Sequence, residues 1–409
     1  MSPKPAYERD AYLTRLDATV VEAGEEKGRP YAVLDDTVLY PEGGGQPPDR
    51  GTLGAAVVVD VQKRDGKVRH YLDRPVAAGP VAVTLDWERR FDHMQQHSGQ
   101  HLLTAVAADR FGWETTAFHL GAEVSDVELS VPSLSPEETA GLEEAVAEEV
   151  RRARPVTARD VTLAEYVALA VRSRGLPDSH EGDVRLVEIT GVDLNTCGGT
   201  HVRSTAELEL VKLLGTESLR GGTRLFFVAG GRARRRFTAH EARNAALRSL
   251  LGAADAELVA AASARLEKLH ESEKRARALE DELSSATADV LAASAGTLVA
   301  RHLPGRAADV LQRLGRELAE RARTKAFLLT SSPSASASAA GAGVFVLAAG
   351  PDVALDLAAA AREVAALLGG RGGGSGRVFQ GKAGDLSRLG EAEALLAARL
   401  GSGRGPGGS

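Results

Sequence analysis

Four short apolar segments follow one another in the first 88 residues. Breaks rich in Gly, Pro and Asp separate them, and the segments are Ala18–Val21, Tyr31–Leu34, Ala55–Val61 and Val81–Leu85. Short apolar runs bounded by turn-forming residues are typical of β-strands. The pattern therefore predicts a small β-barrel or a strongly bent sheet over residues 1–88.

A glycine-rich segment, YPEGGGQPPDRG, interrupts this region between Tyr40 and Gly51. Three successive glycines are a poor interior for a helix or a strand, so a tight exposed turn is expected. Composition alone favours an ordinary loop. The alternative is a backbone that approaches a ligand closely at Gly43, Gly44 and Gly45.

The apolar positions take on a helical period from Arg89 onward. The stretch HMQQHSGQHLLTAVAADRF places Met94, His97, His101 and Val106 near one face. A second helix is expected from about residue 136, because glutamates in its early turns and arginines at its end suit the helix dipole. Predicted strands over 184–189, 208–214 and 224–229 make residues 89–237 a mixed α+β domain.

Alanine, leucine and charged residues dominate the chain from residue 238. Leu269, Ala276 and Leu283 stand seven residues apart, which predicts a helical hairpin or short coiled coil over 238–330 that could join two copies into a homodimer. A low-complexity stretch at 331–343 is expected to be a flexible loop. Beyond it, GVFVLAAG predicts a buried strand and Val353–Leu368 a helix. We therefore expect a C-terminal α/β domain over 331–400, with GGRGGGSGR as a loop, and a disordered tail at 401–409.

Hydrophobic residues make up 43% and charged residues 26% of the 409-residue chain, the balance of a soluble globular protein of two or three domains. No apolar run of about 18 residues indicates a membrane span, and the N-terminus lacks the apolar stretch of a secretory signal. The expected compartment is the cytoplasm. The net charge of −6 is uneven, since residues 301–409 hold 14 Lys and Arg against 9 Asp and Glu, so binding to a polyanion is not excluded.

Two pairs of potential metal ligands stand far apart in the sequence. His97 and His101 are four residues apart on the predicted helix, so both imidazoles lie on one face, although such a pair alone is weak evidence. CGGTH places the chain's single cysteine, Cys197, four residues before His201, and its glycines favour a turn. Three imidazoles and one thiolate suit the tetrahedral preference of zinc. Together the pairs favour one zinc ion per chain over two unrelated packing pairs.

The number of ligands leaves the role of such an ion open. Four protein ligands are usual for a structural zinc, whereas a catalytic zinc keeps one position for water or substrate. Catalysis would need a loose ligand, a shared water or an expanded coordination sphere. The sequence does not decide among these.

These motifs resemble those of a known family. HSGQHLL, CGGTH and YPEGGGQPPDRG, with TTAFHLG, RLVEITGVDLNTCGGTHV and GGTRLFFVAGG, are similar to the alanyl-tRNA editing proteins, often called AlaX. These proteins are free-standing relatives of the editing domain of alanyl-tRNA synthetase. The resemblance covers roughly residues 12–232. The C-terminal region, with VFVLAAG and GGRGGGSGR, resembles the DHH-associated domain that follows editing modules.

The resemblance implies an α+β fold and a catalytic role. A β-barrel with a glycine loop would precede a two-layer α/β editing core, followed by the helical segment and the C-terminal α/β domain. The zinc ligands would be His97, His101, Cys197 and His201. The implied activity is that of a trans-editing hydrolase that removes serine, or glycine, from mischarged tRNA(Ala).

The resemblance also suggests residues of the substrate pocket. His119 in TTAFHLG falls where the family places a polar pocket residue, and Gln46 is a candidate substrate contact. The synthetase commonly has Thr where this chain has Gln100, so the basis of serine-against-alanine discrimination stays open. A complete synthetase would carry an ATP-dependent domain upstream, whereas the editing-like part here begins almost at residue 1. With no P-loop signature, no use of ATP is expected.

Contacts to RNA are expected from basic loops, although each basic residue could merely be solvated. The candidates are Arg232, Arg234, Arg235, Arg236, Arg371, Arg377 and Lys382. In ester hydrolysis, zinc would lower the pKa of a water or polarise the carbonyl, and backbone N–H groups of Gly43–Gly45 would donate to the ester oxygen. Two alternatives remain: a non-catalytic, zinc-stabilised tRNA-binding protein, and a deacylase of Ser-tRNA(Thr), since threonyl-tRNA synthetase editing domains carry a similar four-ligand pattern.

Overall fold

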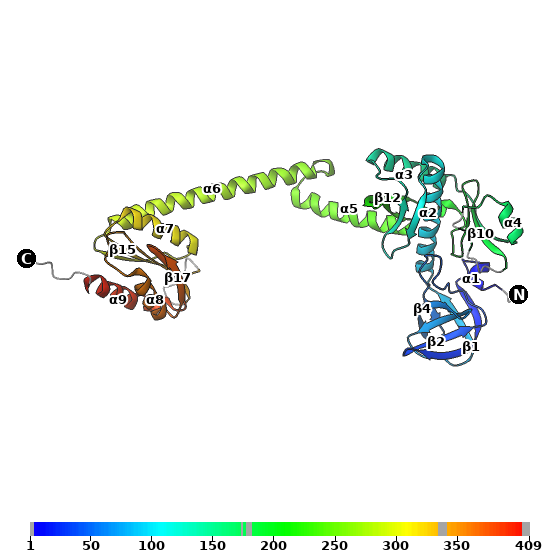
Figure 1. The fold of residues 1–409 in the computed structure, drawn as a ribbon, viewed down its shortest axis with the longest axis horizontal. Coiled ribbons are helices and arrows are strands. Elements are labelled where there is room, and N and C mark those ends of the chain that lie inside the picture. The colour runs from blue at the N-terminus through cyan, green and yellow to red at the C-terminus, as the bar shows by residue number, and fades with distance from the viewer. Residues whose placement is uncertain (1–3, 173–174, 177–181, 334–341, 403–409) are drawn as a thin grey trace, which may run out of the picture. The chain divides into compact units, whose positions relative to one another are not determined.

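The computed structural model describes residues 4–172, 175–176, 182–333 and 342–402, and the chain divides into two compact units, residues 1–250 and 251–409 (Figure 1). Both units combine helices with mainly antiparallel sheets, which confirms the predicted α+β class. Most of the loop predicted at 331–343 and most of the tail predicted at 401–409 lie outside the described residues. In the described part of the chain, no helix is long and apolar enough to cross a membrane.

The first unit begins with a closed antiparallel barrel, which follows the short helix α1 (Ala6–Arg9). The strand order is β1 (Arg15–Glu26), β2 (Arg29–Leu34), β5 (Lys67–Leu72), β4 (Ala56–Arg64), β3 (Gly51–Leu53) and β6 (Gly79–Leu85). Val58, Val61 and Val83 fill its interior, and intervening residues face solvent. The predicted barrel is confirmed. The apolar pattern does not reveal β3 and β5, because β3 has three residues and β5 carries charged residues among its apolar ones.

A 25-residue helix, α2 (Trp87–Phe111), forms the centre of the first unit. Asp86 caps it by accepting a hydrogen bond from the Arg89 N–H at 3.2 Å, and Gly112, with a φ of 71°, ends it. Every residue from His93 to Ala107 is buried. Polar side chains in this stretch therefore need partners inside the protein.

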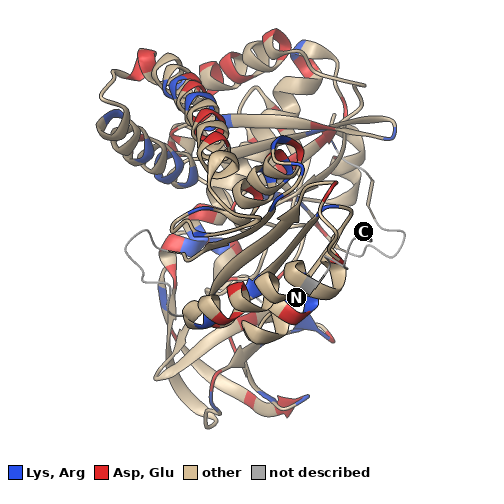
Figure 2. Cartoon of the chain, turned by 90° about the vertical axis from the view of Figure 1, so that its left-hand side faces the viewer, with Lys and Arg blue, Asp and Glu red and all other residues tan. Residues whose placement is uncertain are grey.

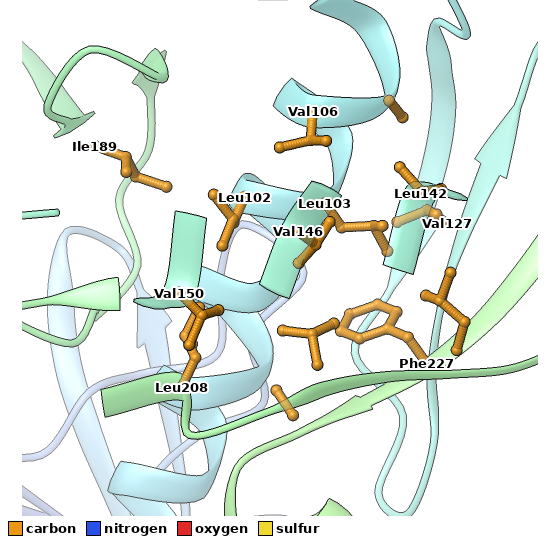
Figure 3. Packing of buried hydrophobic residues seen from close by; sticks show 14 of the residues in the cluster. Leu102, Leu103, Val106, Val127, Leu142, Val146, Val150, Ile189, Leu208 and Phe227 are labelled. Atoms are coloured by element: carbon orange, nitrogen blue, oxygen red, sulfur yellow. The ribbon is translucent and has the colours of Figure 1, made fainter. Parts of the chain in front are cut away.

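The apolar side chains of α2 pack against α3 (Pro136–Arg151) and a four-stranded sheet. The sheet has the order β12 (Val211–Leu219), β13 (Gly222–Ala229), β8 (Ser125–Leu129) and β7 (Thr115–His119). Figure 3 shows Leu103 of α2 beside Val146 of α3, with Phe227 of β13 in the same cluster. Gly99 allows the helix to approach the sheet, since a Cβ there would lie 3.2 Å from the Cβ of Ala229.

A three-stranded sheet precedes the second ligand pair. Its order is β11 (Asp193–Thr196), β10 (Val184–Ile189) and β9 (Val156–Val161), and α4 (Leu163–Ala168) follows β9. The CGGTH segment comes directly after β11. The strand predicted over 208–214 begins only at Val211, because Thr205–Leu208 forms the 3-10 helix η1. After β13, helix α5 (Gly231–Leu251) leads out of the first unit.

The second unit contains a five-stranded sheet with helices on both faces. The sheet order is β14 (Leu298–His302), β15 (Ala326–Ser331), β16 (Gly343–Ala349), β18 (Val378–Ala383) and β17 (Arg371–Ser375). Phe327 and Leu329 pack with α7 (Ala308–Arg321). Ala326 and Leu328 pack with α8 (Leu357–Leu367) and α9 (Leu389–Ser402), which the 3-10 helix η3 (Leu386–Arg388) precedes. Alternate residues of β15 thus serve opposite faces, so its first four residues are all apolar.

The prediction that GGRGGGSGR forms a loop is wrong. Residues 371–375 pair with β18 as the edge strand β17. A Cβ on Gly372 would lie 2.3 Å from the carbonyl oxygen of Gln380, and one on Gly374 would lie 2.4 Å from that of Val378. Only glycine fits where the two backbones come so close, so the residues that suggest a loop are the ones this strand requires.

The long helix α6 (Leu258–Ala293), which follows the 3-10 helix η2 (Asp255–Glu257), carries the seven-residue leucine repeat. Leu269 and Leu283 are 55% and 48% exposed, so this face is not covered within the unit. Figure 2 shows basic and acidic residues interspersed over the helices that face the viewer. The homodimer expected through this segment stays a prediction.

One titratable side chain lies inside the barrel. His70 of β5 is fully buried, with Nδ1 3.1 Å from the carbonyl oxygen of Ala32 and Nε2 2.9 Å from the hydroxyl of Thr37. Because the carbonyl can only accept, Nδ1 carries the proton and Nε2 accepts from Thr37. Burial lowers the pKa of His70 to about 4, so the ring is neutral in the folded barrel.

The barrel is expected to lose stability in acid through this histidine. The folded-state pKa lies below the unfolded value of 6.5, so the unfolded chain binds the proton first as pH falls. The neutral His70 therefore adds to the free energy of unfolding fully above pH 6.5. This stabilisation, up to about 3 kcal/mol, is lost as the pH falls towards 4. Urea unfolding at pH 7 and pH 4.5, followed by tryptophan fluorescence, should show a loss about 2 to 3 kcal/mol larger than in His70→Asn. Equal losses in both proteins would contradict the assignment.

Candidate metal centre

The first ligand pair is positioned by the polar face of α2. His97 and His101 are one turn apart, and both are buried. Gln95 and Gln96, which precede His97 on α2, bind the backbone at the end of β13 and the start of α5. Gln96 exchanges two hydrogen bonds with the backbone of Ala229, at 2.9 and 3.0 Å, and Gln95 accepts one from the N–H of Gly231 at 2.9 Å. The helix can therefore neither slide nor rotate without breaking these bonds.

The second pair lies on the CGGTH turn after β11. Arg185 of β10 supports this turn by donating from Nη1 to the carbonyl oxygens of Cys197 and Gly199, at 2.5 and 3.0 Å. Gly199 lies against the imidazole of His97, and a Cβ there would be 2.3 Å from Cε1 of that ring. Glycine is thus needed at this position because the turn must pass directly over a ligand candidate.

The structure brings the two pairs together. Their ligand atoms lie within 4.8 Å of one another, and we call His97, His101, Cys197 and His201 the four-residue cluster. The Sγ of Cys197 is 3.4 Å from Nε2 of His97 and 3.3 Å from Nε2 of His201. The ring centroids of the three histidines are 4.5 to 5.2 Å apart.

Each imidazole of the cluster has its Nδ1 engaged by a different side chain. His97 Nδ1 is 2.9 Å from Oε1 of Gln46, His201 Nδ1 is 3.0 Å from Oγ of Ser98, and His101 Nδ1 is 3.1 Å from Oδ2 of Asp193. Such partners fix the tautomer and the ring orientation. All three Nε2 atoms are left for a common ligand.

Two of these partners are themselves held firmly. Gln46 is fully buried, and its amide also contacts Thr200, accepting from the N–H at 3.0 Å and donating to the hydroxyl at 2.8 Å. Asp193 accepts from Nε of Arg172 at 3.0 Å, and Arg172 is paired in turn with Asp109. These contacts place the rings before any ion binds.

The electrostatics favour a metal-binding thiolate. Burial raises the pKa of the Cys197 thiol, but the neighbouring His97 and His201 and a hydrogen bond from His101 bring that pKa well below the usual range. Burial lowers the pKa of His201 to about 3 despite the nearby sulfur. Burial lowers the pKa of His101, but hydrogen bonds with Asp193 and Cys197 raise it to about 10. A thiolate and a neutral imidazole are the forms that coordinate metals, so His101 would release a proton when an ion binds. The donor set and its supporting shell therefore fit a metal ion.

Of the other predicted pocket residues, the glycine turn lies near the four-residue cluster and His119 does not. The glycine turn closes through hydrogen bonds between Gly43 and Gln46, at 2.9 and 3.2 Å, with its tip exposed and Gln46 buried. Gly45 lies against Phe118, whose ring centroid is 6.3 Å from that of His97. His119 follows on the same strand, is 60% exposed and contacts Asp126 at 3.0 Å. The structure does not bring His119 to the cluster, because adjacent strand residues face opposite sides.

Most of the candidate RNA-binding arginines on α5 already have carboxylate partners. Arg232 is buried, donates to Asp92 at 2.7 to 3.1 Å, and also binds the carbonyl of Gly121. Arg235 shares Asp92, and Arg234 pairs with Glu209. Arg236 is exposed.

The three candidates in the second unit differ from one another. Arg377 donates to the backbone carbonyl of Pro351 at 2.7 Å. Arg371 and Lys382 are opposite each other on β17 and β18, beside a hollow of about 590 Å³.

Sequence reasoning did not find the supporting residues Ser98, Thr200, Asp193 and Arg185. Ser98 lies inside the HSGQH motif, and Asp193 four residues before Cys197, so proximity in sequence was the only available signal. Their roles depend on contacts between segments that are about one hundred residues apart, such as Ser98 with His201.

Comparison with known proteins agrees with this arrangement. Residues 184–226 match the model described as threonyl and alanyl tRNA synthetase second additional domain. The chain is 37% identical over 410 residues to the mouse protein named alanyl-tRNA editing protein Aarsd1, covering 95% of this chain and 96% of that one. The chain belongs to the alanyl-tRNA editing protein family. The predicted family is thereby confirmed.

Other relatives match about half of the chain or less. Alanyl-tRNA editing protein AlaX-L of Pyrococcus horikoshii is 35% identical over 218 residues, which is 51% of this chain and 53% of that one. The alanine–tRNA ligase of Ignicoccus hospitalis is 36% identical over 239 residues, 55% of this chain and 26% of that one. A solved C-Ala domain of Aquifex aeolicus alanyl-tRNA synthetase covers 25% of this chain and 89% of its own at 22% identity, with a TM-score of 0.23.

The two glycines of CGGTH offer a matched test of the cluster. Gly199→Ala would place a methyl group on the His97 ring and push it from Gln46, whereas Gly198→Ala meets no atom within 4 Å. We expect Gly199→Ala to weaken zinc binding about 10- to 100-fold and Gly198→Ala to change it less than about twofold. Competition titration against a chelating dye measures both, with circular dichroism as the folding control. Equal affinities of the two variants would show that ring placement does not depend on this turn.

Proposed function

We propose that this protein is a trans-editing deacylase that hydrolyses the ester of mischarged Ser-tRNA(Ala), with Gly-tRNA(Ala) as a second substrate. The observation that carries the proposal is the four-residue cluster in a member of the alanyl-tRNA editing family. The cluster lies beside an exposed glycine turn. The AlaX-L relative, which matches 51% of this chain, also bears the name of an editing protein.

The ion proposed for the cluster is one zinc per chain. Three imidazoles and one thiolate are a donor set that suits zinc, whereas calcium, magnesium and manganese bind mainly oxygen ligands. His97, His101, Cys197 and His201 would hold it. A bound zinc would supply Lewis acidity for the ester carbonyl or lower the pKa of a water.

The glycine turn is proposed to stabilise the negative charge that develops on the ester oxygen. Gly43 and Gln46 use their N–H groups within the turn. Among the described residues, no hydrogen bond to the N–H groups of Gly44 and Gly45 is found, and Gly45 lies against Phe118 near His97. Preorganised backbone donors of this kind are effective at developing oxyanions.

Gln100 is proposed to recognise the serine hydroxyl. It is 5% exposed and lies between the two ligand histidines of α2. Its Nε2 donates to the hydroxyl of Thr104 at 3.3 Å, and no partner of Oε1 is found in the described part of the chain. A carbonyl oxygen in this position could accept from a substrate hydroxyl. Alanine lacks that group and would leave the oxygen unpaired.

The second unit is proposed to contact the tRNA through Arg371 and Lys382, which are adjacent across β17 and β18. Both are basic, and phosphate contacts supply affinity without base specificity. Arg377 is less suited because its guanidinium binds backbone carbonyls.

The decisive experiment is a deacylation assay with the full-length protein. Ser-tRNA(Ala) and Gly-tRNA(Ala) are expected to be hydrolysed, whereas Ala-tRNA(Ala) and Ser-tRNA(Thr) should be largely spared. His101→Ala and Cys197→Ala should reduce the rate by at least about 100-fold, because each removes a proposed zinc ligand. Zinc-loaded protein that binds Ser-tRNA(Ala) and leaves it intact would instead favour the non-catalytic alternative. Preference for Ser-tRNA(Thr) would favour the threonyl branch.

Substitution of Gln100 tests the specificity proposal separately. Gln100→Leu keeps the volume of the side chain but removes the acceptor. We expect the ratio of kcat/KM for Ser-tRNA(Ala) over Ala-tRNA(Ala) to fall about 10-fold or more, since one hydrogen bond in a buried site is lost. Thr104→Val is the control, because it removes the internal partner of Gln100, along with the bond of that hydroxyl to the His101 carbonyl, and keeps the Gln100 acceptor. An unchanged ratio in Gln100→Leu would exclude this residue as the discriminator.

A further inference from the structure

A hollow of about 490 Å³ lies next to the four-residue cluster in the first unit. The first turns of α2 line most of it, including Arg89, Asp92 and His93, and Pro47 completes one side. Pro47 follows Gln46, which binds His97, and His93 precedes His97 by one helical turn on the same face. A helical turn rises about 5.4 Å, so the hollow begins roughly one turn away from the cluster.

Two arginines at this place have no carboxylate partner. Arg89 is half-buried, and its Nε donates to the carbonyl of Pro48 at 3.0 Å. Arg50 lines an adjoining hollow of about 480 Å³ that shares Asp86 with the first. In the part of the chain that the structure describes, neither guanidinium forms an ion pair. Burial and the charge of Arg50 lower the pKa of Arg89, and the carboxylates of Asp49, Asp86 and Asp92 offset this in part.

The carboxylates around the hollow are largely occupied. Asp92 is bound by Arg232 at 2.7 Å and by Arg235 at 3.0 Å. Asp86 caps α2. Glu88 is exposed, with its side chain among the residues at the edge. Asp49, Asp86 and Asp92 act on Arg89 without forming an ion pair with it, so an anion against its guanidinium would add a direct contact that the described protein groups do not supply.

A buried histidine of the hollow also lacks a partner. His93 is 4% exposed, and its Nδ1 has no hydrogen-bond partner among the described residues. Burial, with the charge of Arg89 next in size, keeps the ring neutral by lowering its pKa to about 3. A neutral imidazole can donate one hydrogen bond to an anion. A buried nitrogen without a partner is uncommon, so His93 is a polar group beside the hollow that the described protein leaves unsatisfied.

We propose that this hollow, together with the adjoining one that Arg50 lines, binds a backbone phosphate of the RNA substrate close to its aminoacylated 3′ end, with Arg89 and Arg50 as cationic contacts and His93 as a neutral hydrogen-bond donor. The inference rests on the proposed deacylase function. Guanidinium groups match phosphate geometry, and the half-buried Arg89 is preorganised by its bond to Pro48. A phosphate held one helical turn from the cluster would fix the position of the terminal ester.

The test compares two substrates that carry the same ester. Ser-tRNA(Ala) has the phosphates, whereas 3′-O-seryl-adenosine has none. Arg89→Gln is expected to lower kcat/KM for Ser-tRNA(Ala) about 10- to 100-fold, as for loss of a charged hydrogen bond, and to leave seryl-adenosine within about twofold of wild type. The slope of log kcat/KM against log salt for the tRNA should also become shallower by about one.

Two further variants keep the result interpretable. Arg64→Gln makes the same charge change on an exposed barrel residue outside both hollows, and it should affect neither substrate. Arg50→Gln changes an exposed residue, and it should reproduce the tRNA-specific loss if Arg89→Gln is unstable.

Three outcomes contradict the inference in distinguishable ways. An equal loss on both substrates would assign the hollow to the nucleoside or the amino acid and overturn the phosphate assignment. No loss on either substrate in both variants would overturn it as well, while the deacylase function would stand. A wild-type protein that hydrolyses seryl-adenosine and Ser-tRNA(Ala) at no measurable rate would overturn the deacylase function and this inference with it.

Discussion

The three Nδ1 hydrogen bonds of the four-residue cluster connect three parts of the first unit. Gln46 comes from the barrel region, Ser98 from α2 and Asp193 from the three-stranded sheet, and each orients one imidazole. Moving any of these parts would turn at least one ring. A metal site assembled in this way depends on the packing of the whole unit, and its supporting contacts matter nearly as much as the ligands.

A buried ion pair maintains the link between the barrel and α2. Arg90 and Asp49 are both fully buried, and Arg90 also donates to the carbonyls of Ala11 and Val38. Asp49 accepts in addition from the N–H of Tyr40, so both ends of the glycine segment are tied to the helix. Removing one partner of such a pair typically costs about 3 to 5 kcal/mol, because the other charge stays buried alone. The pair therefore holds the segment that carries Gln46 against α2.

The distribution of paired and unpaired arginines separates structural from functional basic residues. Arg232 and Arg172 each have carboxylate partners and brace the first unit. Among the described residues, Arg89 and Arg50 have no such partner, and they line two adjoining hollows of the same unit. The number of arginines in a segment is therefore a weak indicator of nucleic-acid binding. Arginines without a carboxylate partner are the better indicator.

The sequence alone determined the features that depend on short spacing. HSGQH on a helix and CGGTH on a glycine turn each define a ligand pair within five residues, and alternating or helical apolar periods revealed the barrel and α2. The glycine edge strand β17 was missed, because its side-chain-free backbone has no period to read. Which pairs meet, which side chains support them and which arginines stay unpaired were decided only by the tertiary structure. Arg232 and Asp92 are 140 residues apart, and the nearness of such groups follows from how α2 packs against the sheets, which no local pattern encodes.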